Sequence, residues 1–252
     1  MLANKFLVID IEATCWEHNK PPIGEQHEII EIGFAIIDIK QQIISEKGSI
    51  LVKPEISKVS EYCTKLTTLT QTDVNNGVTF SKACNILKTN YKSNKLMWGS
   101  WGNYDRNMFY SQCKRTGVEY PFSNTFINLK TIYSIFNKMD IGISVKKALE
   151  KESIVFEGTR HRGIDDAYNI AKLFLRMIQR YSLSNVCYSI PIIKDVSNSD
   201  NIHKLKPNPE LGTPFLCKNC GTFLGCSKNF DKYAGPIICP VCKHDNGNTI
   251  II

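Results

Sequence analysis

An apolar strand that ends in two acids constrains this chain more than any other feature of its sequence. Residues 6–11 are apolar except for Asp10, and Glu12 follows directly. Because side chains alternate along a strand, both carboxylates point to one face, while Ile9 and Ile11 point to the other. Adjacent half-buried anions are costly unless a cation neutralises them, and carboxylate oxygens suit Mg²⁺ or Mn²⁺. The alternative is an edge strand with two exposed acids.

The order of the remaining elements predicts an α/β fold. Two more strands are expected at 29–39 and 49–52, the second after a turn at Glu46-Lys47-Gly48. Helices are expected at 80–91 (with Thr79 or Ser81 as N-cap), from about 104, and at 129–136, 145–151 and 165–181, with a short strand at 95–98. The last helix has an apolar stripe at helical spacing, formed by Ala167, Ile170, Ala171, Phe174, Leu175 and Ile178. Leading strands followed by alternating helices and strands indicate an α/β domain over residues 1–182.

The composition excludes collagen-like, low-complexity and membrane-spanning classes. Of 252 residues, 42% are hydrophobic and 22% charged, which is enough apolar material for a core. No segment approaches the roughly 18 uninterrupted apolar residues of a membrane span, and the first residues lack the pattern of a secretory signal. We therefore expect an intracellular, cytoplasmic protein with no membrane association, the nucleus being left open. A net charge of +7 suits a polyanionic partner without requiring one.

Two later segments add acids and a histidine to the first pair. Asp105 follows a strand and opens a helix, where N-terminal capping is the simpler explanation. His161 lies on a glycine-containing loop just before Asp165 and Asp166. Asp165 fits the helix start as a cap, whereas Asp166 lies near the apolar stripe and can face the sheet. For His161 the simpler explanation is a surface-loop imidazole.

Together, four carboxylates and one imidazole match two-metal phosphodiester hydrolysis. The set comprises Asp10, Glu12, Asp105, Asp166 and His161. Two ions about 3.5–4 Å apart stabilise the attacking and leaving oxygens in such sites. A neutral imidazole can take the proton from the attacking water.

The order of these motifs resembles the DEDDh (RNase T-like) 3′→5′ exonucleases. The matching segments are Asp10-Ile-Glu12-Ala-Thr14, Trp101-Gly-Asn-Tyr-Asp105-Arg and His161-Arg-Gly-Ile-Asp165-Asp166. A fourth, Leu66-Thr67-Thr68-Leu69-Thr70, is similar to a loop of the ERI branch, whose members trim RNA. Thr68 departs from the family, which usually has glycine there. The resemblance covers about residues 5–180 and implies an RNase H-like fold, a mixed central sheet flanked by helices.

The resemblance also implies a role for each site residue. Asp10, Glu12 and Asp166 would hold the first Mg²⁺ or Mn²⁺, Asp10 and Asp105 the second, and His161 would be the general base. The residues implied to contact the terminal nucleotide are Ala13, Thr14, Leu66, Thr67 and Trp101. Core packing is the alternative for Leu66 and Trp101.

A separate cluster of cysteines predicts a zinc-binding module at residues 214–252, after a Pro-, Asn- and Ser-containing linker at 183–213. Two Cys-x2-Cys pairs, Cys217 with Cys220 and Cys239 with Cys242, are separated by a spacing typical of a tetrahedral site for one structural Zn²⁺. Cys226 is then a spare thiol, and His244 a less favoured ligand. The module could be a structural plug, or it could bind nucleic acid or a protein partner through interleaved basic and aromatic residues.

The sequence therefore predicts a metal-dependent 3′→5′ exonuclease that acts on RNA or another single-stranded nucleic acid. One alternative is a non-catalytic adaptor that binds nucleic acid or protein through the zinc module. Another is an exonuclease directed at DNA, since the same chemistry cuts both sugars.

Overall fold

A five-stranded mixed sheet forms the centre of the protein in the computed structural model, which describes residues 5–123, 126–137, 143–181, 214–216 and 223–226. The strand order is β3-β2-β1-β4-β5. Strands β1 (Lys5–Ala13), β2 (Ile29–Asp38) and β3 (Ile43–Leu51) form an antiparallel meander, and β4 (Met97–Ser100) and β5 (Phe126–Asn128) add in parallel beyond β1. This arrangement confirms the predicted mixed α/β sheet.

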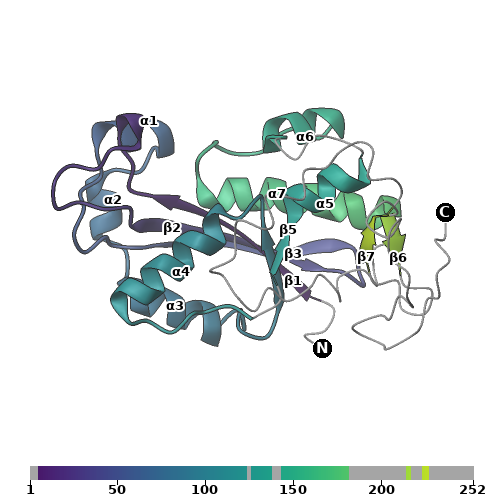
Figure 1. Ribbon diagram of the computed structural model, residues 1–252, viewed down its shortest axis with the longest axis horizontal. Helices are drawn as coiled ribbons and strands as arrows, with labels where there is room; N and C mark the ends of the chain where they lie inside the picture. The colour runs from purple at the N-terminus through teal and green to yellow at the C-terminus, as the bar shows by residue number, and fades with distance from the viewer. Residues whose placement is uncertain (1–4, 124–125, 138–142, 182–213, 217–222, 227–252) are drawn as a thin grey trace, which may run out of the picture.

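Helices cover both faces of this sheet (Figure 1). On one face, α7 (Gly163–Tyr181) packs with α5 (Leu129–Phe136) and α6 (Val145–Lys151) against apolar residues of β1 and β2. On the other face lie α3 (Phe80–Thr89) and α4 (Tyr104–Thr116). Strand β1 supplies both cores, because Phe6 and Val8 face α7 while Leu7 and Ile9 face the opposite layer.

The predicted helices agree closely with the observed ones. Helices α5 and α6 have the predicted bounds, and Thr79 caps α3 by accepting from the backbone N–H of Lys82. The predicted stripe of α7 is buried, apart from the part-buried Leu175. The helix begins at Gly163, however, so Asp165 lies inside its first turn and does not precede it as a cap. Two short helices, α1 (Glu61–Thr67) and α2 (Gln71–Asn75), and a turn of 3-10 helix, η2 (Glu17–Asn19), lie where no separate element was predicted.

The prediction for the third strand was wrong at its start. The expected turn Glu46-Lys47-Gly48 lies inside β3, paired with residues 34–36 of β2. Because β3 is a sheet edge, charged side chains can point to solvent there without breaking the strand. Gly48 serves packing, since a Cβ at this position would lie 2.5 Å from the ring of Phe34. Strand β4 is also displaced from the predicted 95–98, and Gly99 lies inside it. Glycine is needed there for packing, because a Cβ would lie 2.4 Å from the carbonyl oxygen of Ile127.

The C-terminal part is described only at β6 (Pro214–Leu216) and β7 (Phe223–Cys226), which pair antiparallel. Cys217, Cys220, Cys239 and Cys242 lie outside the described residues, as does the linker at 183–213. The zinc module and the division of the chain into domains therefore stay predictions.

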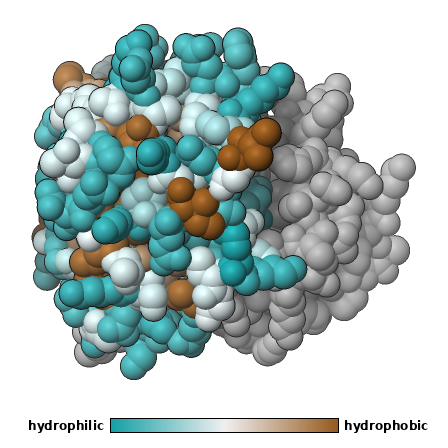
Figure 2. Space-filling model, turned by 90° about the vertical axis from the view of Figure 1, so that its left-hand side faces the viewer, coloured by the Kyte–Doolittle hydropathy of each residue, from teal (hydrophilic) through white to brown (hydrophobic). Residues whose placement is uncertain are grey.

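The outer surface agrees with a globular domain. Figure 2 shows the side where α1 and α2 lie, and its apolar groups form small separate patches on a mostly hydrophilic face. Within the part of the chain that the structure describes, no helix is both long and apolar enough to cross a membrane.

Candidate active site

Three carboxylates converge at the end of β1. Asp10 and Glu12 continue the face of Phe6 and Val8, towards α7, and Asp166 comes from the first turn of that helix. One carboxylate oxygen from each acid lies within 4.8 Å of the other two. The alternative of an edge strand with exposed acids is wrong, because β1 is the central strand and Glu12 is 9% exposed.

A contact between two glycines brings Asp166 to the sheet. A Cβ on Gly33 of β2 would lie 1.8 Å from the carbonyl carbon of Gly163, the first residue of α7. A Cβ on Gly163 would in turn lie 2.9 Å from the backbone nitrogen of Gly33 and 3.0 Å from the carbonyl oxygen of Asp10. The helix therefore approaches β1 and β2 at backbone distance, which only residues without a side chain permit.

Asp105 reaches the same strand end from the opposite layer. It is the second residue of α4, is 6% exposed, and its Oδ1 accepts a hydrogen bond of 3.0 Å from the backbone N–H of Ile11. The pairing of β1 with β4 ends at Val8, so the backbone N–H of Ile11 lies beyond the part of β1 that pairs with β4. Helix capping thus does not account for its position, because the carboxylate bonds to β1.

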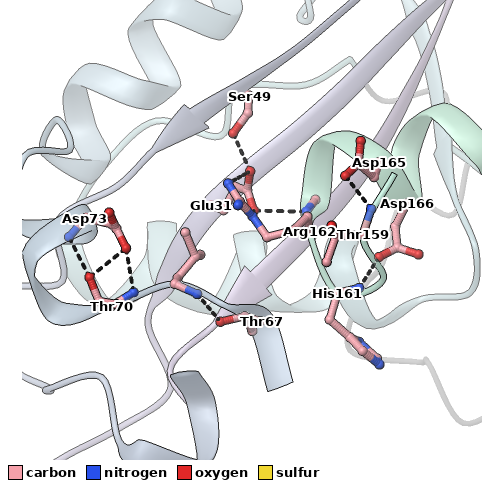
Figure 3. A network of polar contacts seen from close by, with 12 residues as sticks. Glu31, Ser49, Thr67, Thr70, Asp73, Thr159, His161, Arg162, Asp165 and Asp166 are labelled. Atoms are coloured by element: carbon pink, nitrogen blue, oxygen red, sulfur yellow. Dashed lines mark hydrogen bonds and ion pairs between the residues drawn. The ribbon is translucent and has the colours of Figure 1, made fainter. Parts of the chain in front are cut away.

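His161 lies on the loop that leads into α7. Its backbone N–H donates to Oδ2 of Asp166 at 2.6 Å, and its φ of 58° is in the left-handed region. The side chain is exposed, and Figure 3 shows the imidazole projecting away from the carboxylate that holds its backbone. The loop is therefore fixed to a member of the carboxylate cluster while the ring remains accessible.

Burial and the crowding of the acids raise the pKa values of these carboxylates. Burial, followed by the charges of Asp166, Glu31 and Asp105, raises the pKa of Glu12 to about 8. Burial, followed by the charges of Asp105, Asp166 and Glu12, holds the pKa of Asp10 well above its usual range. The pKa of Asp105 is raised to about 6 by burial, against the effect of its hydrogen bonds, and burial raises that of Asp166. Such a set of oxygen donors fits a hard divalent cation, whose charge makes several adjacent carboxylates tolerable.

The predicted substrate residues differ in burial and in their hydrogen-bond partners. Ala13 is buried at the end of β1, and Leu66 is part-buried on α1 rather than on the loop we expected. Thr67 is buried, and its hydroxyl donates to the carbonyl of Cys63. Thr14 has its backbone N–H bonded to the carbonyl of Glu28, and its own carbonyl accepts from Nδ1 of His27. For these four residues a role in substrate binding stays a prediction.

Trp101 packs into the core beneath α5 and α6. Its indole N–H donates to the carbonyl oxygen of Ile143 at 3.0 Å, and its ring lies 5.6 Å from that of Tyr133. The side chain is part-buried. These contacts favour the packing alternative over a base-lining role.

The sequence reasoning missed three residues around the site. Glu31 is fully buried on β2 directly opposite Glu12, and Arg162 forms an ion pair with it. A charged residue inside the apolar run 29–39 was the available signal for Glu31. Tyr104, next to Asp105, is 58% exposed.

Comparison with known proteins agrees with this geometry. Residues 7–174 match the RNase_T family, described as "Exonuclease", and the chain belongs to that family. It is 34% identical over 185 residues to human "3'-5' exoribonuclease 1", a match that covers 68% of this chain and 52% of the human protein. It is 29% identical over 202 residues to the Drosophila melanogaster "3'-5' exonuclease Snipper", covering 71% of both chains.

A solved structure shares the fold, at a sequence identity similar to that of these two relatives. The crystal structure of the nuclease domain of 3'hExo, described as a DEDDh family member bound to rAMP, superimposes with a TM-score of 0.63 at 30% identity. The match covers 70% of this chain and 92% of that domain. The expected RNase H-like exonuclease fold is thereby confirmed, whereas the chain spans only about half the length of the human relative.

Proposed function

We propose that this chain is a metal-dependent 3′→5′ exonuclease that acts on RNA and releases nucleoside 5′-monophosphates. The observation that carries the proposal is the convergence of Asp10, Glu12 and Asp166 within 4.8 Å, from segments separated by more than 150 residues in sequence. Family membership supports the reaction class. A role in RNA degradation is supported by the human relative, an exoribonuclease by name, and by the related nuclease domain bound to rAMP.

The position of each acid suggests its role. Asp10, Glu12 and Asp166 would hold one Mg²⁺ or Mn²⁺, and Asp10 with Asp105 a second. When bound, two such ions stabilise the charge on the attacking and leaving oxygens of the phosphodiester. Asp105 also holds the end of β1 through Ile11, so it orders the strand that carries the first two ligands.

His161 is our candidate for the general base. Its ring is exposed, and its backbone is fixed to Asp166, so the loop that carries the imidazole is held to a member of the carboxylate cluster. An imidazole titrates near neutral pH and can take a proton from water in the reaction. We further propose that Ala13, Thr14, Leu66 and Thr67 line the place of the terminal nucleotide.

The sharpest test compares Asp10→Asn with a matched control. Asp10→Asn keeps the size of the side chain and removes one charge from the cluster. Asp38→Asn removes a carboxylate from the far end of β2, where Asp38 is paired with Lys5. With Mn²⁺ and a 5′-labelled RNA, the wild type and Asp38→Asn should shorten the RNA stepwise from its 3′ end. Asp10→Asn should lose activity by about 10³-fold or more while keeping the melting temperature of a folded protein.

Substrate controls separate the alternatives. A blocked 3′ end or EDTA should stop the reaction, and a matched DNA strand tests whether the 2′-hydroxyl is sensed. Full activity of Asp10→Asn would refute the assignment of the site. Absence of hydrolysis by the wild type with Mn²⁺ present would favour the adaptor.

We keep the zinc module as a separate proposal. Cys217, Cys220, Cys239 and Cys242 would bind one structural Zn²⁺, as thiolate pairs at this spacing do in small modules. Elemental analysis of the purified full chain should give one zinc per molecule, and Cys239→Ser should lower that content. An unchanged zinc content would refute this ligand set.

A further inference from the structure

Glu31 is buried directly opposite Glu12 yet takes no part in the carboxylate cluster. It lies on β2, is 0% exposed, and is the cross-strand partner of Glu12. The cluster of converging oxygens consists of Asp10, Glu12 and Asp166, without Glu31. A buried anion this close to other anions needs its own partners, because an unpaired buried charge is strongly destabilising.

Those partners come from β3 and from the residues at the start of α7. Oε1 accepts from the hydroxyl of Ser49 at 2.6 Å and from Nη2 of Arg162 at 3.4 Å. Oε2 accepts from Nε of Arg162 at 3.1 Å and from the backbone N–H of Gly163 at 3.0 Å. Both oxygens are therefore occupied by donors from β3 and from the start of α7 (Figure 3).

The segment that Glu31 holds is the one that carries His161 and leads to Asp166. Three carboxylates bind backbone N–H groups of this segment: Asp165 binds Thr159, Asp166 binds His161, and Glu31 binds Gly163. Asp165 and Asp166 belong to α7 itself, so they move with the helix. Among these three, only Glu31 ties the segment to the sheet, and it does so at a helix N-terminus, where a carboxylate is favourable.

We infer that Glu31, through Arg162 and Gly163, is a positioning residue that sets where the first turn of α7 lies relative to β1. It thereby fixes Asp166 against Asp10 and Glu12 and holds the loop of His161, without touching metal or substrate. The inference rests on the proposed function for its kinetic consequences, whereas its structural consequences can be measured on a protein without nuclease activity.

Glu31→Asp tests position separately from charge. It keeps the negative charge but retracts the carboxylate by about 1.5 Å, the length of one carbon–carbon bond. The 3.0 Å bond to Gly163 then exceeds the limit of about 3.5 Å for a hydrogen bond. If Glu31 acted only through its charge, this variant would behave like the wild type.

The other end of α7 offers a matched control. Glu152 is also a buried glutamate paired with an arginine of α7, Arg180 in the last turn, and it accepts from the hydroxyl of Tyr133. Glu152→Asp therefore disturbs a similar ion pair to α7, at the end of the helix opposite to Asp166. Any effect of simple destabilisation should appear in both variants.

Three measurements on the full-length protein decide the inference. Amide hydrogen exchange of residues 159–163 should be about tenfold faster in Glu31→Asp, and the Kd for Mn²⁺ by calorimetry should rise by about tenfold or more. The kcat for RNA should fall by about 10- to 100-fold with KM changed by less than about threefold, because positioning affects the reacting geometry more than binding. Glu152→Asp should leave all of these within about twofold of the wild type.

Unchanged exchange and Mn²⁺ affinity in Glu31→Asp, or equal changes in Glu152→Asp, would overturn the inference. A wild-type protein that binds Mn²⁺ but does not cut RNA would instead refute the proposed function, and the first two measurements would still decide the role of Glu31. Should Glu31→Asp fail to fold, Arg162→Lys replaces it. That variant keeps the positive charge of a less buried side chain and loses the paired Nε and Nη2 donors, so the same changes are expected.

Discussion

Replacement of Gly33 by alanine should separate α7 from the sheet and disable the site without unfolding the protein. The added Cβ would lie 1.8 Å from the carbonyl carbon of Gly163, 1.9 Å from its oxygen and 2.3 Å from the nitrogen of Ile164. Carbon atoms in contact are normally about 3.5–4.0 Å apart, so the start of α7 must withdraw by about 1.7–2.2 Å. All of the close atoms are backbone, so no side-chain rotation can relieve the clash.

The magnitude follows from the geometry of the cluster. The carboxylate oxygens of Asp10, Glu12 and Asp166 span 4.8 Å, so a shift of this size moves Asp166 by a third of that span or more. Misplacement by about 1 Å can cost about 10²-fold in rate. Overpacking costs about 1–3 kcal/mol of unfolding free energy, which leaves a typical domain folded.

The assay combines urea unfolding, Mn²⁺ titration and RNA hydrolysis, with Gly117→Ala as control. Gly117 ends α4 with a φ of 67°, and a Cβ there would meet no atom within 4 Å. It should lose about 1 kcal/mol through backbone strain and keep full activity. A folded Gly33→Ala with kcat and Mn²⁺ affinity within about twofold of the wild type would refute the claim that the glycine contact sets the site.

Two further predictions concern charge and backbone strain. In EDTA, the melting temperature should fall as pH rises from about 5 to 8. The pKa of Glu12 is about 8 in the folded protein against 4.5 for an ordinary glutamate, so the folded state keeps a proton that the unfolded chain has released. Saturating Mn²⁺ should remove this trend, and a metal-free melting temperature that rises over the same range would contradict the prediction. Thr68→Gly should raise the free energy of unfolding, measured in urea, by about 0.5–1 kcal/mol. Thr68 ends α1 with a φ of 63°, a conformation that costs a β-branched residue more than glycine. A gain of the same size in Thr68→Ala would show that backbone strain is not the cause.

The left-handed backbone at Thr68 agrees with the glycine that the family resemblance implies at this position. The family usually has glycine where this chain has threonine, and the left-handed conformation is what glycine favours. The chain keeps the helix end all the same: the backbone N–H of Thr68 donates to the carbonyl of Thr64. The residue type alone does not reveal this conformation, which the dihedral angle of Thr68 gives directly.

The acids of the site could be predicted because their geometry is local. Asp10 and Glu12 share a face through strand alternation, and Asp166 follows the phase of a helix whose stripe is visible in the sequence. The bounds of β3 and β4 could not be predicted in the same way. Gly48 and Gly99 are needed for contacts with Phe34 and Ile127, which are distant in sequence, so local rules interpreted them as turn residues.

Glu31 shows how a functional residue escapes local reasoning altogether. Its environment depends on the register of β2 against β1, which places it opposite Glu12, and on a helix that begins 132 residues later. Once the sheet buries this anion, its charge must be compensated by protein groups. The unpaired N–H groups of a helix N-terminus and an adjacent arginine provide that compensation.

The same requirement therefore acts on two neighbouring sets of acids at the start of α7. In the first set, Asp10, Glu12 and Asp166 crowd together in an arrangement that fits a bound cation. In the second, Glu31 is balanced by Arg162 and Gly163. Because the protein already neutralises Glu31, a cation is drawn to the other three acids, and the ion pair that satisfies Glu31 also holds the helix that completes their cluster.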